Sequence, residues 1–427
     1  MTTKLLIFGI TGDLSRRKLL PALKEITGTG DFDDLEIIGV SRRDVDVEGL
    51  LIGSVGDSQL ASKVSVFKMD LAEANDYVRL KDYLNIQDDQ QLVAYMSVPP
   101  AATTQIVDLM GEAGLNGPNV KLLFEKPFGM DLESARDVLA RTANYYDEQQ
   151  IYRIDHYLAK EMAQNIVAFR GGNALFHHIW NNQFIESIEI VASEKIGIEG
   201  RAQFYEQTGA LRDVLQGHLM QLLALVLMEV PDHLNWAQLP AKRLEALNNL
   251  QVANRAKAIR AQYEGYQEEV ENPGSQTETF VSVQLESDDP RWVGVPLRLT
   301  TGKALNEKTT EIRINLKKYH EAQSNCLKFR VQPNEGIEID LFAKKPGYSR
   351  QFTTESLSFN YPADAKLPDA YEQVIVDAIS GHKNLFTESD EVLRSWEVLQ
   401  PIMNFWSMNE APMPKYPKNS PISSVIG

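Results

Sequence analysis

The most informative spacing in this sequence lies in residues 153–161, which read Arg-Ile-Asp-His-Tyr-Leu-Ala-Lys-Glu. If the chain is helical from His156 onward, the side chains of His156 and Lys160 lie four positions apart on one helix face. Two cationic groups on one face repel each other, so an anion bound between them, near the free N–H groups of the helix start, explains the spacing better. The segment predicts a site for a phosphate monoester, and a solvated helix end is the alternative.

A glycine-bearing turn, Gly9-Ile10-Thr11-Gly12-Asp13-Leu14, lies between an apolar run and an amphipathic stretch. Glycines there let the backbone approach a pyrophosphate, whose charge is favoured by the N-terminus of the following helix. The third glycine of the six-residue dinucleotide fingerprint is absent, so an ordinary glycine turn is the alternative.

The next apolar run ends at Ser41, Arg42 and Arg43, where many NAD enzymes have an acidic residue that binds the ribose. A guanidinium at this position can hold the extra phosphate of NADP. NADP is therefore the predicted cofactor and NAD the weaker alternative. The other interpretation is that both arginines are solvent-exposed loop residues with no role in binding.

Three further strings carry reactive side chains. Lys126 follows an apolar run in the string Phe124-Glu125-Lys126-Pro127, at the sheet edge where ligands lie, so it could reach the nicotinamide or a sugar hydroxyl. His218 lies on an otherwise strongly apolar predicted helix, where a histidine is more often a core residue than a catalytic base. The lysine-bearing turn of residues 301–308 says little by itself.

The pattern of elements predicts two domains, 1–155 and 156–427. In the first, runs with strand character alternate with helical spacing, which favours a Rossmann-like parallel, doubly wound sheet. The expected strands are 4–8, 35–41, 92–98 and 120–124, and the expected helices begin near 14 and span 101–113 and 131–146, with Asp131 as N-cap. In the second, long helices at 161–169 and 211–228 mix with strands at 188–192, 280–285, 311–316, 327–331 and 337–342. This mixture predicts an α+β domain with a mostly antiparallel sheet, followed by an irregular tail at 411–427.

Composition narrows the class of protein. The chain has 427 residues, 43% of them hydrophobic, and a formal net charge of −16, which disfavours binding to nucleic acid or to anionic membranes. The single cysteine, Cys326, rules out an intramolecular disulfide and fits a reducing compartment, for which we expect the cytoplasm. No export signal is recognised, and the apolar segment 219–230 is too short to span a membrane, so we expect a buried helix there. No metal site is expected, because His177 and His178 lack ligand spacing.

Together these strings resemble the glucose-6-phosphate dehydrogenase family from Lys4 to about Ala411, although the chain is shorter than is usual for the family. The Asp-His-Tyr-Leu-x-Lys-Glu string is highly specific to the family. The glycine motif running on to Pro21, the Glu-Lys-Pro-Phe-Gly string and Ile198-Glu199-Gly200-Arg201 follow in the expected order.

The resemblance implies oxidation of glucose 6-phosphate to 6-phosphogluconolactone, the first step of the oxidative pentose phosphate pathway. In this scheme His218 is the general base for the anomeric hydroxyl, Asp155 orients its imidazole, and hydride passes to NADP. The implied substrate contacts are Lys126, His156, Tyr157, Lys160, Glu194, Asp213, Lys303 and Lys308. The implied NADP contacts are Gly9, Thr11, Gly12, Asp13, Leu14, Arg42 and Lys126. A homodimer formed through the large sheet of the second, substrate-binding domain is also implied.

Three departures from the family pattern leave the preferred hexose phosphate less defined than the reaction: Ala159, Gly217 and Thr300 replace the usual glycine, asparagine and arginine. Two alternatives stay open. One is a related NAD(P)-dependent dehydrogenase of another sugar or sugar phosphate, with Lys126 as its main acid or base. The other is a non-catalytic NADP-binding protein, against which the presence of both Asp155 and His218 counts.

Overall fold

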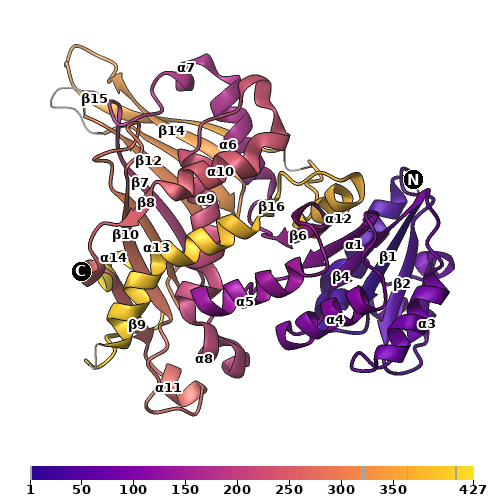
Figure 1. The fold of residues 1–427 in the computed structure, drawn as a ribbon. Coiled ribbons are helices and arrows are strands. Elements are labelled where there is room, and N and C mark those ends of the chain that lie inside the picture. Colours follow the sequence, from indigo (N-terminus) through magenta and orange to yellow (C-terminus); the bar gives the residue numbers. More distant parts are fainter. Residues whose placement is uncertain (1, 319–323, 363, 409–410) are drawn as a thin grey trace. The chain divides into compact units, whose positions relative to one another are not determined.

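The computed structural model describes residues 2–318, 324–362, 364–408 and 411–427 (Figure 1). Its contacts divide the chain into two units. Unit 1 comprises Met1–Ala159 and Pro368–Val392, and unit 2 comprises Lys160–Leu367 and Leu393–Gly427. The structure differs from the predicted division after residue 155 mainly because residues 368–392 return to unit 1.

Unit 1 contains a seven-stranded sheet in the order β16-β6-β5-β4-β1-β2-β3. Strands β1 to β6 pair in parallel, and β16 pairs antiparallel with β6. Apart from β16, this is the 3-2-1-4-5-6 order of dinucleotide-binding sheets, so the predicted Rossmann-like sheet is confirmed. The strands are β1 (Thr2–Phe8), β2 (Glu36–Ser41), β3 (Val64–Lys68), β4 (Gln90–Met96), β5 (Val120–Phe124), β6 (Ile151–Ile154) and β16 (Phe386–Thr387).

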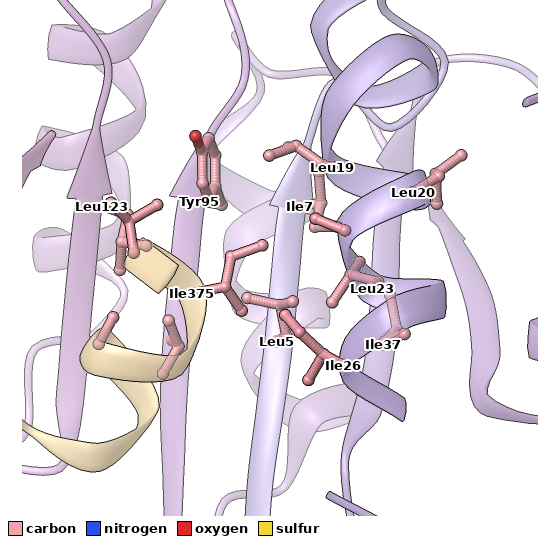
Figure 2. Close-up of a cluster of buried hydrophobic side chains, with 14 of the residues drawn as sticks. Leu5, Ile7, Leu19, Leu20, Leu23, Ile26, Ile37, Tyr95, Leu123 and Ile375 are labelled. Atoms are coloured by element: carbon pink, nitrogen blue, oxygen red, sulfur yellow. The ribbon is translucent and has the colours of Figure 1, made fainter. Parts of the chain in front are cut away.

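Helices cover both faces of this sheet because its strands are apolar on both sides. The helices are η1 (Ser15–Leu19), α1 (Leu20–Gly28), α2 (Val47–Val55), η2 (Gln59–Lys63), α3 (Ala74–Leu84), α4 (Pro100–Glu112), α5 (Leu132–Ala143), η3 (Glu148–Gln150) and α12 (Ala370–Ser380). On one face, Ile375 of the returning helix α12 packs in one cluster with Leu5 and Leu23 (Figure 2). On the other, Leu6 packs with Leu80 of α3. The predicted N-cap is confirmed, because the Asp131 carboxylate accepts a hydrogen bond from the Ser134 N–H at 2.9 Å.

Unit 2 is built on a ten-stranded sheet in the order β15-β14-β13-β12-β7-β11-β10-β9-β17, with β8 also pairing with β10. Among the described strands of unit 2, only β7–β11 and β9–β17 are parallel pairs, so the predicted mostly antiparallel sheet is confirmed. The strands are β7 (Ile185–Ser193), β8 (Leu250–Val252), β9 (Ile259–Tyr263), β10 (Phe280–Ser287), β11 (Leu297–Gly302), β12 (Thr309–Leu316), β13 (Cys326–Gln332), β14 (Gly336–Lys344), β15 (Phe352–Asn360) and β17 (Lys415–Tyr416).

The longest apolar helical run of unit 2 is buried. It consists of α8 (Ala202–Ala210), the π-helix η4 (Leu211–Leu219) and α9 (Met220–Leu227). Within the described residues it is the one helix long and apolar enough to cross a membrane, but 78% of its most apolar window is buried inside the protein. The predicted buried helix is confirmed, with a break in helical geometry at Gly209.

Shorter helices complete this part of the chain: α6 (Glu161–Gly172), α7 (Ala174–His177), η5 (Asp232–Leu234), η6 (Trp236–Gln238), α10 (Leu239–Asn248), η7 (Arg255–Lys257), α11 (Tyr266–Glu269), α13 (Ser389–Ser407) and α14 (Ile422–Ile426). The predicted irregular tail at 411–427 is confirmed only in part, because two short regular elements interrupt it. Residues Lys415 and Tyr416 form β17, and Ile422 packs against a core cluster that contains the buried Tyr416.

Candidate active site

The glycine turn after β1 has a shape that only glycine permits at its first position. Gly9 has φ +84°, and a Cβ there would overlap the carbonyl oxygen of Ser97, which follows β4. The Gly12 N–H and the Ser15 hydroxyl both donate to the Gly9 carbonyl at 2.9 Å. Because β1 and β4 flank the point where the strand order reverses, the turn lies where this sheet type binds dinucleotides. The cradle fits a pyrophosphate.

The other predicted cofactor residues belong to the same turn or to the next strand. Thr11 and Asp13 are exposed, with the Arg16 Nε donating to the Thr11 carbonyl at 3.0 Å and Arg17 pairing with Asp13 at 2.8 Å. Leu14 is the residue before η1. Arg42 is exposed directly after β2, and in the described parts of the chain it makes no ion pair. The set fits a nicotinamide dinucleotide.

Two carboxylates stand at the carboxyl ends of the adjacent parallel strands β5 and β6. Glu125 accepts a hydrogen bond from the Tyr95 hydroxyl. Burial raises the pKa of Glu125 to about 7; the Tyr95 hydrogen bond opposes this, the Asp155 charge adds to it and the adjacent Lys126 opposes it. Sequence reasoning treated Glu125 only as part of a string. Its partner Tyr95 was not identified because it lies within an apolar strand.

The segment after β6 is a turn and not the start of a helix, so the helical spacing predicted for His156 and Lys160 is wrong. The Asp155 side chain is 1% exposed and accepts a hydrogen bond from the Tyr157 N–H at 2.9 Å. His156 and the buried Tyr157 have ring centroids 5.2 Å apart. An aspartate that binds the N–H two residues on offers the backbone an alternative to a helix, which explains the turn.

The helix α6 instead begins at Glu161, with Lys160 as its N-cap residue. The Met162 N–H, in the first turn of α6, donates to the Glu335 carboxylate at 3.2 Å. Burial raises the pKa of Glu335, and the charge of Lys160 acts in the opposite direction. Lys160 and Glu335 therefore neighbour each other within unit 2.

Glu194 and Lys303 meet at the ends of two adjacent parallel strands. Ser193 at the end of β7 pairs with Gly302 at the end of β11, which places the next residue of each strand side by side. The Lys303 ammonium forms an ion pair with the Glu194 carboxylate, and Lys303 is only 3% exposed. It also lies 5.3 Å from the ring centroid of Tyr205. This is a buried cation held by a carboxylate and an aromatic face, suited to a polar ligand.

Tyr205 connects this pair to a third predicted residue. Its side chain is 1% exposed, and burial raises its pKa well above the usual range, with further contributions from Asp213, Glu278 and Glu194. The structure therefore brings Asp213 near the Tyr205 ring, on which the Lys303 ammonium also lies. Sequence reasoning missed Tyr205 because a single aromatic residue on a mixed polar and apolar helix has the pattern of a core residue, although it follows the Ile198–Arg201 string closely.

His218 lies on η4 and is 5% exposed. The backbone hydrogen bonds of a π-helix join residues five positions apart, so Asp213 and His218 are one turn apart. π-helices are rare and frequent at functional sites, and η1, the other one described, directly follows the glycine turn. Lys308 is exposed just before β12 and forms no ion pair within the described residues. No group of three or more His, Cys, Asp or Glu suited to a metal ion occurs among those residues.

The predicted site residues are thus distributed over both units. Unit 1 supplies the cofactor turn, Arg42, Lys126, Asp155, His156 and Tyr157, and unit 2 supplies Lys160, Glu194, Asp213, His218, Lys303 and Lys308.

Comparison with known proteins accounts for nearly the whole chain. Residues 6–165 match the NAD binding domain of glucose-6-phosphate dehydrogenase, and residues 167–423 match its C-terminal domain. A glucose-6-phosphate 1-dehydrogenase of Mycolicibacterium smegmatis is 35% identical over 94% of this chain and 90% of its own length. That of Bacillus subtilis is 33% identical over 97% of this chain and 94% of its own length.

Solved structures agree with these matches. A glucose-6-phosphate dehydrogenase in complex with its substrate glucose 6-phosphate has a TM-score of 0.92 at 28% identity, covering 100% of this chain and 97% of that chain. A glucose-6-phosphate 1-dehydrogenase from Mycobacterium avium has a TM-score of 0.87 at 31% identity, covering 99% and 96%. The chain belongs to the glucose-6-phosphate dehydrogenase family.

Proposed function

We propose that this protein oxidises glucose 6-phosphate at the anomeric carbon to 6-phosphogluconolactone, with NADP as hydride acceptor. The observation that carries the proposal is the similarity to glucose-6-phosphate 1-dehydrogenases over more than nine-tenths of this chain and of the relative in Bacillus subtilis. The glycine cradle at Gly9 and the buried Lys303–Glu194 pair support it, because the reaction needs a dinucleotide site and a polar pocket for a sugar.

Proton removal is assigned to His218 and its orientation to Asp155. The imidazole of His218 takes the proton of the anomeric hydroxyl as hydride leaves the same carbon, so a carbonyl forms there and the product is a lactone. The carboxylate of Asp155 fixes the tautomer of the ring and stabilises the imidazolium. The bound nicotinamide supplies the hydride acceptor.

Recognition of the sugar phosphate is assigned to cationic and hydroxyl-binding side chains. His156, Tyr157 and Lys160 hold the phosphate group. The remaining contacts to the sugar are Lys126, Glu194, Asp213, Lys303 and Lys308. Because Lys160 is a point charge at the N-terminus of α6, Lys160→Ala should raise the KM for glucose 6-phosphate strongly. A KM that scarcely changes would favour an unphosphorylated sugar as substrate.

Preference for NADP over NAD is assigned to Arg42. The exposed guanidinium at the end of β2 supports this assignment, since it can bind the 2′-phosphate by charge-assisted hydrogen bonds. Arg42→Ala should weaken the binding of NADP while leaving the binding of NAD nearly unchanged. Arg43→Ala is the matched control. Activity with NAD alone would refute the role of Arg42.

A homodimer and a cytoplasmic location complete the proposal. The edge strand β15 and its neighbour β14 expose Leu341, Phe352, Leu357 and Phe359, and an exposed apolar patch of this kind is typical of an association surface. Sedimentation should give twice the chain mass, and Leu357→Asp should give the monomer. The single cysteine supports a reducing compartment, which cell fractionation tests.

The reaction is tested with a spectrophotometric panel. Glucose 6-phosphate, its 2-amino and galactose analogues and 6-phosphogluconate are each offered with NADP and then with NAD. NADPH formation from glucose 6-phosphate is the expected result. Binding of NADP without turnover of any sugar phosphate would identify a non-catalytic NADP-binding protein.

A further inference from the structure

Residues 411–427 pack along the turn that carries Lys303. Leu305 and Ser420 form an isolated parallel bridge. The Asn419 N–H donates to the Ala304 carbonyl at 2.7 Å, and the Asn306 N–H donates to the Ser420 carbonyl at 3.1 Å. The two segments are more than 100 residues apart in the sequence, so this pairing is a feature of the tertiary structure and not of local chain geometry.

Tyr416 makes the most direct contact with the lysine. Its hydroxyl donates to the Lys303 carbonyl at 2.7 Å and lies 3.0 Å from the Thr279 hydroxyl. The side chain is 3% exposed, and burial raises the pKa of Tyr416, so the phenol stays neutral and able to donate. The Lys303 N–H donates to the Thr279 carbonyl at 2.9 Å, so both backbone groups of Lys303 have tertiary partners.

The conformation of the turn explains why such partners are needed. Ala304 has φ +53°, in the left-handed region that a residue with a Cβ adopts only at a cost of about 1 kcal/mol or more. A strained residue persists where its surroundings over-determine it. Ala304 is held by its N–H, which donates to the Ile196 carbonyl at 2.9 Å, and by the Asn419 contact to its carbonyl.

We propose that residues 411–427 belong to the substrate-binding machinery, with Tyr416 as a positioning residue that fixes the backbone of Lys303. With the backbone fixed, the Lys303 ammonium stays between the Glu194 carboxylate and the Tyr205 ring, ready to bind a sugar hydroxyl. The inference rests on the proposed function for the identity of the ligand. It adds that a segment remote from the substrate motifs sets the affinity for that ligand.

The test is Tyr416→Phe, which keeps the packed ring and removes the hydroxyl. Loss of the hydrogen bond to the Lys303 carbonyl should raise the KM for glucose 6-phosphate roughly three- to tenfold, with kcat within about twofold and the KM for NADP unchanged. The matched control is Tyr263→Phe. Tyr263 lies in the same core cluster, but its hydroxyl donates to Glu269 at 2.7 Å and not to the lysine turn. Its KM for glucose 6-phosphate should remain that of the wild type.

Two further measurements distinguish a positioning role of Tyr416 from a general loss of protein stability in the variant. In a Lys303→Met background, Tyr416→Phe should add no further change in KM, because the side chain that it positions is gone. Amide hydrogen exchange of residues 301–308 should be faster in Tyr416→Phe than in Tyr263→Phe. Equal exchange in the two variants, or an equal rise in KM, would overturn the inference. Wild-type protein that turns over no glucose 6-phosphate would refute the proposed function, while hydrogen exchange would still decide whether Tyr416 fixes the turn.

Discussion

Replacing Gly209 by alanine is expected to destabilise unit 2 and to slow catalysis together. Gly209, near the end of α8 and two residues before η4, has φ 64° and ψ 178°, a region that is essentially accessible to glycine alone. A Cβ at this position would lie 2.6 Å from a carboxylate oxygen of Glu278. That same oxygen accepts a hydrogen bond from the Leu211 N–H at 3.0 Å, at the start of the helix that carries His218.

The magnitude follows from two contributions. The backbone conformation costs a non-glycine residue about 1 to 3 kcal/mol. Moving the Glu278 carboxylate leaves the Leu211 N–H without its partner, and a buried unpaired group costs about 1 to 3 kcal/mol more. Glu278 is 5% exposed, so water does not replace the lost bond. The total, about 2 to 6 kcal/mol, corresponds to a fall in Tm of order 10 °C. Displacement of η4 should lower kcat at least about tenfold.

Thermal unfolding and initial rates measure the two effects, and Gly200→Ala is the matched control. Gly200 also has a positive φ, 75°, but a Cβ added there would meet no neighbouring atom within 4 Å, so alanine at this position has only the backbone cost. Gly209→Ala should therefore be clearly less stable and less active than Gly200→Ala. Equal Tm and equal rates for the two variants would refute the reasoning about Glu278.

Three more outcomes follow from carboxylates that have buried partners. Glu278→Gln keeps an acceptor for the Leu211 N–H, so its Tm in thermal unfolding should fall less than the Tm of Gly209→Ala. The pKa of Glu125 rises from its usual 4.5 to about 7, so folding favours the protonated acid and stability falls as pH rises through that range. In urea unfolding, the free energy of unfolding of Glu125→Gln relative to the wild type should therefore increase by up to about 3 kcal/mol between pH 4.5 and 8. A difference that does not change with pH would contradict this. Glu148→Ala leaves the buried Arg153 unpaired and should cost about 3 to 5 kcal/mol, measured by the same unfolding.

The elements of the fold that the sequence predicts well are those determined by residues close together in the sequence. The strand Val120–Phe124 and the N-cap at Asp131 depend on neighbouring residues, and both are found as predicted. The short strand β6 has only four residues, too few for a periodic pattern, and it was not predicted. The false helix start at His156 has a specific cause, because the Asp155 carboxylate binds the Tyr157 N–H and holds a turn.

The parts of the site that sequence does not predict depend on distant contacts. Tyr205 and Tyr416 have the pattern of core residues, and only the fold shows them beside Lys303. The role of Glu278 requires a broken helix whose first N–H groups have no partner within the chain segment itself. Candidate binding residues can be predicted from the sequence because their charges and motif spacing are local. The residues that would position them can be identified only from the folded structure.

The most direct test of the central claim is NADPH formation from glucose 6-phosphate by the wild type and by His218→Asn. The wild type should reduce NADP with glucose 6-phosphate and not with 6-phosphogluconate. His218→Asn should bind both ligands but lose about a hundred- to ten-thousandfold in kcat, as expected when a general base is removed. A wild type that reduces NADP with no sugar phosphate, or a His218→Asn variant with the wild-type rate, would contradict the account.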